Sequence, residues 1–373
     1  MTTIRALVCV LIAALAAAGQ ETRAAAPDAI DLKFVYRAGR TTRQRMVSRT
    51  VGSMKLFDPL PEQNFAQTFE QDLTLTCRQA NPDGSAVLDM TMDRVAMKMS
   101  IGGLNMEFDS AAPATQPNDR LDTRMLARIF SAMVGSTLTV IVGPDGQPSR
   151  IEGVKQFKEK MLNSLADEPV PASLRKLLEQ VSGMFDDESM MKEMQSSYRL
   201  IPNERKRVGD RWERSWNMKI PLFNGKIDGQ GRYELLGVEE FRGRKCAKIA
   251  VKESFQMAAT PEVETPAGAA ASSPAKGLVE RLRFDLKASG GEGTAYWDYE
   301  NGELVQLRQV QRLTMEISMP TDADPKGRQT NTGKPAMVQK LTTAESVDLL
   351  EDAPASARGA PATPGSAPAP ASP

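Results

Sequence analysis

Methionine is the residue type whose spacing most resembles a chemical site in this chain, which contains 20 methionines among its 373 residues. In "LDMTMDRVAMKMSI", Met90 and Met92 share one parity, and Met97 and Met99 share the other. Side chains two positions apart on a strand lie on the same face of a sheet. Three interpretations of these thioethers compete: a packed core, a pliable apolar cavity that accepts varied ligands, or capture of Cu(I).

The chain contains no histidine. This absence removes Ser-His-Asp triads, Cys-His pairs and histidine-ligated metal sites. Carboxylates cluster in "FDDESMMKEM", but there they lie at an expected helix start, where the helix dipole favours negative charge. The Ser-x-x-Lys pattern at Ser173 is better explained as a capped helix. We therefore expect no enzymatic activity, no catalytic residue, no metal and no cofactor, with a carboxylate enzyme as a remote alternative.

The net charge of the chain bears on its partners, and residues 1–19 bear on its location. Lys plus Arg and Asp plus Glu number 47 each, so no charge excess favours nucleic acid as a partner. Residues 1–19 read "MTTIRALVCVLIAALAAAG", in which one arginine precedes a short apolar run and small residues. This pattern is typical of a secretory signal peptide. We expect an exported bacterial protein, periplasmic or extracellular, that is not an integral membrane protein after cleavage.

Two cysteines, Cys77 and Cys246, follow the expected signal peptide. An exported protein can hold a disulfide between them. Two buried, unpaired thiols that pack as small apolar side chains are the alternative. Sequence spacing does not establish the geometry that a disulfide needs, so both interpretations stay open.

Periodicity predicts a mostly antiparallel β fold with helices (α+β), in two β units separated by a helical segment. Two long segments lack core-forming residues and are expected to be a flexible insertion and a disordered Ala/Pro-rich tail. The expected division is 27–153 for the N-terminal β unit with a helix at 119–135, 154–199 for the helical segment, 200–350 for the C-terminal β unit with the insertion 258–277, and 351–373 for the tail.

Each β unit contains a hairpin with an acidic or amide residue before glycine, "TVIVGPDGQPSRIEG" from Thr139 and "AYWDYENGELVQLRQ" from Ala295. Such turns mark ordinary hairpins, and they also fit a duplicated β unit. The expected architecture is either one strongly curved sheet or two related half-barrels, packed on amphipathic helices. The parity change between Met92 and Met97 predicts a bulge or turn at Asp93-Arg94.

The helical segment begins with "VKQFKEKMLNSL", whose apolar residues form one stripe at helical spacing. The residues of this stripe are Val154, Phe157, Met161, Leu162 and Leu165. We expect such a stripe to lie against a sheet or against another helix.

The stretch "IPNERKRVGDRW" resembles an uncharacterised family of exported bacterial proteins known only as a domain of unknown function. The residues that carry this resemblance are Pro202, Val208, Gly209, Asp210, Trp212, Tyr233, Leu235, Gly243, Cys246 and Ile249. The layout and the "WDYENGEL" hairpin, with Gly302 in its turn, are also similar to the periplasmic lipoprotein-carrier superfamily. That resemblance implies an incomplete antiparallel barrel over helices, with acyl chains held in the cavity.

Val208-Gly209-Asp210 predicts a turn that enters a strand, on which Trp212 and Trp216 share a face. We interpret the protein as a non-enzymatic envelope protein that binds an apolar or lipidated ligand between sheet and helices. The candidate lining residues are Met90, Met92, Met97, Met99, Phe130, Trp212, Trp216 and Trp297. The alternative is a structural or protein-interaction component of the envelope with a filled core.

Overall fold

The computed structural model describes the chain in seven ranges, and several predicted segments fall outside them. The described residues are 29–56, 61–112, 121–165, 187–220, 225–257, 283–318 and 337–350. The expected signal peptide, the helical pattern at 173–185, the insertion 258–277 and the tail 351–373 lie outside the described residues.

Long strands make up most of the described chain. The strands are β1 (Ile30–Leu32), β2 (Thr41–Leu56), β3 (Gln63–Ala80), β4 (Ala86–Ile101), β5 (Leu104–Asp109), β6 (Thr137–Val142), β7 (Pro148–Glu152), β8 (Glu204–Lys206), β9 (Arg211–Ile220), β10 (Gly225–Phe241), β11 (Arg244–Met257), β12 (Arg283–Asp298), β13 (Glu303–Ser318) and β14 (Met337–Leu350). The helices are α2 (Leu121–Met133), α3 (Val154–Asn163) and α5 (Asp187–Tyr198).

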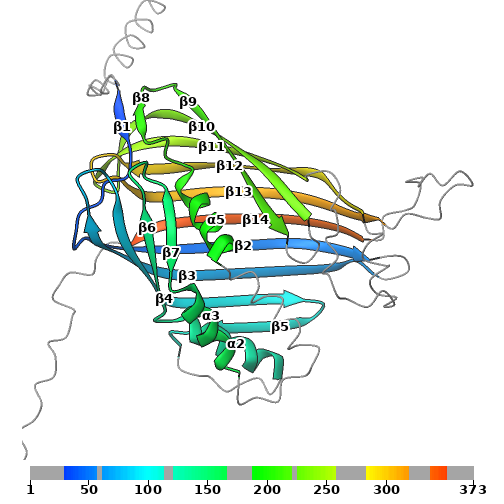
Figure 1. Ribbon diagram of the computed structural model, residues 1–373. Coiled ribbons are helices and arrows are strands. Elements are labelled where there is room, and N and C mark those ends of the chain that lie inside the picture. The colour runs from blue at the N-terminus through cyan, green and yellow to red at the C-terminus, as the bar shows by residue number, and fades with distance from the viewer. Residues whose placement is uncertain are drawn as a thin grey trace, which may run out of the picture.

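One antiparallel sheet of 12 strands organises the protein, in the order β7-β6-β4-β3-β2-β14-β13-β12-β11-β10-β9, with β5 paired to β4. The sheet is curved and open, and the three helices lie on its concave side (Figure 1). A mostly antiparallel β fold with a curved sheet is therefore confirmed. The alternative of two half-barrels is wrong, because β14 pairs with β2 from Met337 to Leu350 and joins the two β units into one sheet.

The turn chemistry read from the sequence accounts for the β3–β4 hairpin. Gly84 has a φ of 90°, a conformation that a glycine adopts without steric cost. The carboxylate of Asp83 accepts the backbone N–H of Ser85 at 2.9 Å. The two strands then pair from Ala80–Ala86 outward.

A first core lies between the helices and β3, β4 and β6. Val154, Phe157 and Met161 of α3 are buried in it, as is Leu165 just after the helix. Leu162, which the stripe placed on the same face, is 39% exposed. Its neighbour Met161 occupies the core instead, and adjacent helical residues point about 100° apart.

A second core lies where the short sheet of β1 and β8 covers the start of β9 and the middle of β10–β12. Leu32, Leu235 and Ile249 are fully buried there.

Cys77 in the first core and Cys246 on β11 are both buried free thiols, which confirms the interpretation as unpaired cysteines. Within the described ranges, no helix is long and apolar enough to cross a membrane.

Candidate ligand-binding face

The sheet has an inner face, which carries the helices, and an outer face. Alternation along each strand separates the two. On β11, for example, Val251, Glu253 and Phe255 are buried or half-buried on the inner face. Their neighbours Lys252 and Ser254 are exposed on the outer face. The inner face is therefore shielded and the outer face is open to solvent.

The predicted bulge at Asp93 is present and decides where the methionines lie. Asp72 of β3 pairs with Arg94, and the next residue, Leu73, pairs with Met92. Asp93 is thus the extra residue of a β-bulge in β4. The bulge shifts the alternation of side chains by one residue, so that residues of opposite parity before and after it lie on the same face. Both methionine pairs consequently lie on the inner face.

All eight candidate residues face the inner side, but they divide into two groups by burial. Met97, Trp212 and Trp297 are buried at 6%, 7% and 2% exposure, and the two tryptophans lie in the second core. The others are half-buried: Met90, Met92, Met99, Phe130 and Trp216. Met90, Met92 and Phe130 pack at the margin of the first core.

Phe130 of α2 contacts two aromatic rings of the sheet. Its ring centroid lies 5.8 Å from that of Phe69 and 5.9 Å from that of Phe108. Met99 lines a pocket of about 440 Å³ with side chains of β3 and β5. The candidates therefore do not form one cluster, and Met99 and Trp216 lie near opposite margins of the sheet.

The strands of the sheet extend beyond the helices (Figure 1). The strand register aligns a row of apolar side chains across the inner face in this part of the sheet. We call it the distal belt. It consists of Trp216, Phe255, Leu313, Leu341, Phe65 and Ile101, which follow one another through the strand register. All six are half-buried.

The distal belt is continuous because glycines let its large side chains lie flat. A Cβ on Gly52 would lie 2.9 Å from both Leu341 Cδ2 and Phe65 Cζ, so these two side chains fill the space that the glycine leaves. Trp216 lies over Gly229 in the same way, and its ring centroid is 5.4 Å from that of Phe255. The glycines thus allow the large side chains of the distal belt to form one continuous apolar surface.

Polar side chains cross the inner face between the distal belt and the cores. This polar band consists of Arg214, Glu253, Gln309, Gln311, Glu345, Thr343, Thr50, Ser48 and Gln67. Glu253 accepts hydrogen bonds from Gln309 and Gln311, each at 3.0 Å. The hydroxyls of Thr50 and Thr343 are 3.0 Å apart. The inner face therefore offers an apolar surface beside a hydrogen-bonding one.

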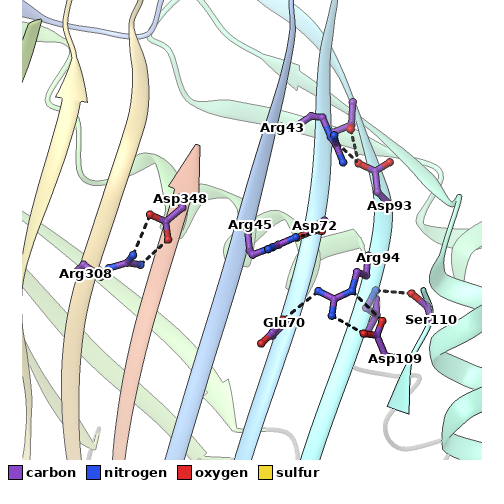
Figure 2. A network of polar contacts seen from close by, with 12 residues as sticks. Arg43, Arg45, Glu70, Asp72, Asp93, Arg94, Asp109, Ser110, Arg308 and Asp348 are labelled. Atoms are coloured by element: carbon purple, nitrogen blue, oxygen red, sulfur yellow. Dashed lines mark hydrogen bonds and ion pairs between the residues drawn. The ribbon is translucent and has the colours of Figure 1, made fainter. Parts of the chain in front are cut away.

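The outer face carries a row of alternating charges, which we call the outer charge row: Asp348, Arg45, Asp72, Arg94 and Asp109 (Figure 2). Arg45 binds Asp72 through two hydrogen bonds of 2.7 and 2.8 Å. Arg94 binds Asp109 at 2.9 and 2.6 Å. Opposite charges on facing residues stabilise strand pairing, so this row favours the register that joins β14 to β2 and β3.

Two carboxylates of the outer charge row, Asp109 and Asp348, have lowered pKa values. Hydrogen bonds from Arg94 lower the pKa of Asp109. For Asp348, burial opposes ionisation, but hydrogen bonds from Gln306 and Arg308 outweigh it and lower the pKa. These groups therefore act as ion-pair partners of arginine rather than as proton donors. In the described part of the chain, no group of three or more Cys, Asp or Glu residues is placed to hold a metal ion.

The motif around Gly209 forms the predicted turn. Gly209 has a φ of 92°, and the Asp210 carboxylate accepts the backbone N–H of Arg207 at 2.8 Å. Trp212 follows on the inner face and donates its Nε1–H to the carbonyl of Leu200 at 3.1 Å. Pro202 is buried, whereas Val208 is half exposed. These residues shape the entry of β9.

Gly302 closes the β12–β13 hairpin in a left-handed conformation with a φ of 64°. Its backbone N–H donates to the carbonyl of Asp298 at 2.7 Å. The buried Asp298 carboxylate accepts the backbone N–H groups of Glu300 and Asn301. Both "WDYENGEL" and the Gly209 motif thus form hydrogen-bonded turns.

Sequence reasoning missed most of the distal belt and the whole polar band. Leu313 and Met315 alternate visibly along β13, which identified a strand but not the face that it presents. Which face is inner depends on β14 pairing with β2, a contact between residues nearly 300 positions apart. Without that pairing, no signal connects Phe65 to Leu341.

The geometry defines a class: an open, curved antiparallel sheet with helices and a shielded apolar surface on its concave side. A family model described as "Family of unknown function (DUF6263)" matches residues 83–277, more than half of the chain. The chain belongs to this family, which confirms the resemblance to a domain of unknown function. No curated protein sequence matches the chain.

The solved structures to which the chain is similar have low sequence identity and low TM-scores. A chain described under "Lipid-protein interactions in lipovitellin" has a TM-score of 0.38 and 9% identity, covering 85% of this chain. This protein spans only 26% of the length of that chain. DynF from the dynemicin biosynthesis pathway of Micromonospora chersina has a TM-score of 0.17 and 9% identity, with coverage of 86% and 85%. A DUF1329 family protein from Desulfovibrio piger has a TM-score of 0.11 and 7% identity, with coverage of 82% and 85%.

Proposed function

We propose that this protein is an exported, non-enzymatic protein of the bacterial envelope that binds an apolar or lipidated ligand on the inner face of its sheet. The distal belt is the observation that carries the proposal. Six apolar side chains line a concave surface beyond the contacts of the helices, and each is only half-buried. A ligand that covers these side chains removes apolar surface of both the protein and the ligand from water.

The energy available from such burial is sufficient for binding. Covering roughly 200 Å² of apolar surface contributes about 5 kcal/mol, before the cost of ordering the ligand is subtracted. The ligand lies over Trp216 and Met99 at the two margins of the sheet. Of the other candidates, Met90, Met92 and Phe130 border the site, whereas Met97, Trp212 and Trp297 support its floor from within the cores.

Methionine contributes adaptability to this surface. Met54, Met99 and Met315 are half-buried inner-face residues near the distal belt. Their unbranched, polarizable side chains conform to ligands of different shape. This composition favours a ligand class, such as acyl chains, over one rigid molecule.

Export is part of the proposal and rests on the signal-peptide pattern of residues 1–19. An acyl ligand is a natural cargo in that setting, because amphiphiles that cross an aqueous compartment need their apolar surface covered. The similarity to periplasmic lipoprotein carriers supports the same function.

Native mass spectrometry of the full chain, purified from the envelope of the producing cell, tests the proposal. We expect a co-purifying mass at one copy per protein, which organic extraction then identifies as a lipid or an acylated peptide. A clean protein mass that stays unchanged after incubation with excess fatty acid would contradict ligand binding. That result would favour the alternative, a structural or protein-interaction component of the envelope.

A further inference from the structure

The polar band ends on β9 in a corner that is rich in hydrogen-bond donors. Arg214 and Trp216 lie two positions apart on the inner face of this edge strand. The facing residues on β10 are Gly231 and Gly229, and the side chains of Tyr233 and Trp216 fill the space above them. The corner lies on the inner face, next to the start of the distal belt.

Three N–H donor groups converge in this corner. The guanidinium of Arg199 stacks on the Trp216 indole, 4.4 Å from the ring centroid. Arg214 donates to the backbone carbonyls of Pro202 at 3.2 Å and of Glu213 at 3.4 Å. Within the described ranges, Arg214 has no carboxylate partner.

The third donor is the indole Nε1 of Trp216, which is buried and meets no acceptor among the described residues. A buried N–H group without an acceptor costs free energy, and most such groups in proteins are paired with protein, water or ligand. Trp216 thus lacks a partner at the point where two arginines stand beside it. An anion placed there would accept hydrogen bonds from Trp216 Nε1 and Arg214.

The two described carboxylates near these groups have other partners. Glu204, which interacts electrostatically with Arg214, pairs with Lys206 at 2.7 Å. Glu253 is engaged by Gln309 and Gln311. Tyr233 lies between it and the arginines: burial and, to a lesser extent, Glu253 raise the pKa of Tyr233 to about 12, against the opposing effect of Arg199 and Arg214. Both guanidinium groups therefore lie near Tyr233 on the inner face.

We propose that this corner binds the anionic head group of an amphiphile whose tail lies along the distal belt. The inference rests on the proposed function and deepens it, because it selects negatively charged amphiphiles over neutral ones. Arg214 neutralises the head, and Trp216 Nε1 donates to one of its oxygens. From Trp216 to Leu341 the register crosses five strand spacings, roughly 24 Å. This span accommodates a long acyl chain.

A displacement assay with ligands that share one tail tests the head-group site. Tetradecanoic acid, tetradecyl phosphate and methyl tetradecanoate compete for the full-length protein against a neutral fluorescent probe. We expect the acid to bind about 10- to 100-fold more tightly than the ester, the range of charge-assisted hydrogen bonds. Arg214→Gln is expected to remove this difference and to leave the ester affinity unchanged.

Arg232→Gln is the matched control. It removes the same positive charge as Arg214→Gln, but Arg232 lies on the outer face of β10 at 64% side-chain exposure. It is expected to keep the preference for the acid. Equal binding of acid and ester by the wild type overturns the head-group site but leaves ligand binding intact. Failure of all three ligands overturns the proposed function itself.

Two further outcomes are informative. If Arg214→Gln weakens all three ligands equally, Arg214 shapes the face rather than binding the head, and the proposal is wrong. If the acid binds tightly and the phosphate does not, the site is supported and its ligand carries a carboxylate. If both anions bind tightly, the site is supported as a general anion site.

Discussion

Replacing Asp72 by alanine is expected to lower the free energy of unfolding by about 2–3 kcal/mol. The Asp72 side chain is 7% exposed and binds Arg45 through both oxygens. Its removal leaves Arg45 and Arg94 on either side with no anion between them. Losing one partner of a fully buried pair costs about 3–5 kcal/mol, and the 42% exposure of the Arg45 side chain reduces that cost.

Urea unfolding followed by circular dichroism measures this effect. Glu107→Ala is the matched control, because Glu107 forms a cross-strand pair with Lys98 on the same face, at 66% and 68% exposure. Exposed pairs contribute little, so the control is expected to unfold nearly as the wild type does. Equal stability of the two variants would show that the outer charge row does not hold the sheet together.

Replacing Leu341 by glutamate is expected to weaken binding of an apolar ligand by about 100-fold or more. Leu341 lies in the middle of the distal belt, between Leu313 and the side chain of Phe65, which reaches over Gly52. A carboxylate there either loses water when the ligand covers it or keeps the ligand away. Displacement of a fluorescent fatty-acid probe measures the change.

Ala344→Glu provides the control on the same strand. Ala344 is exposed on the outer face of β14, so the new charge stays in water and the ligand affinity is expected to stay unchanged. Thermal unfolding of both variants separates lost binding from lost folding. Wild-type affinity in a folded Leu341→Glu variant would remove the distal belt from the binding site.

Local signals predicted the parts of the fold that depend on short sequence distance. The parity change identified the bulge at Asp93. Asn81-Pro82-Asp83-Gly84 has the composition of a turn and forms the one between β3 and β4, and Gly135 follows the end of α2 with a φ of 71°. Each of these features is set by backbone sterics and side-chain parity within a few residues.

The arrangement that makes the site depends on contacts that no local pattern contains. The β14–β2 pairing joins eleven strands side by side in one sheet and so determines which face of each strand is concave. The same pairing makes Leu341 and Phe65 neighbours. The sequence shows Arg45 and Asp72 as two charged residues far apart in the chain and does not show that they form a pair. Their partnership follows from register, which long-range pairing determines.

The prediction that Trp212 and Trp216 share a face is confirmed, but the two side chains have different surroundings. Trp212 and Trp216 are four positions apart, which placed them together on the inner face. Trp212 is covered by β1 and β8, whereas Trp216 lies beyond them at the distal belt. Burial by a separate sheet is a tertiary property, so spacing alone could not separate the two.

Quenching of Trp216 fluorescence by a dibrominated fatty acid tests the central claim most directly, because bromine quenches an indole only at contact. The chain has three tryptophans, and Trp212 and Trp297 are 7% and 2% exposed. We predict saturable quenching of the wild type at one fatty acid per protein, and its loss in Trp216→Phe. Absence of saturable quenching in the wild type, or equal quenching in Trp216→Phe, would contradict a ligand on the inner face.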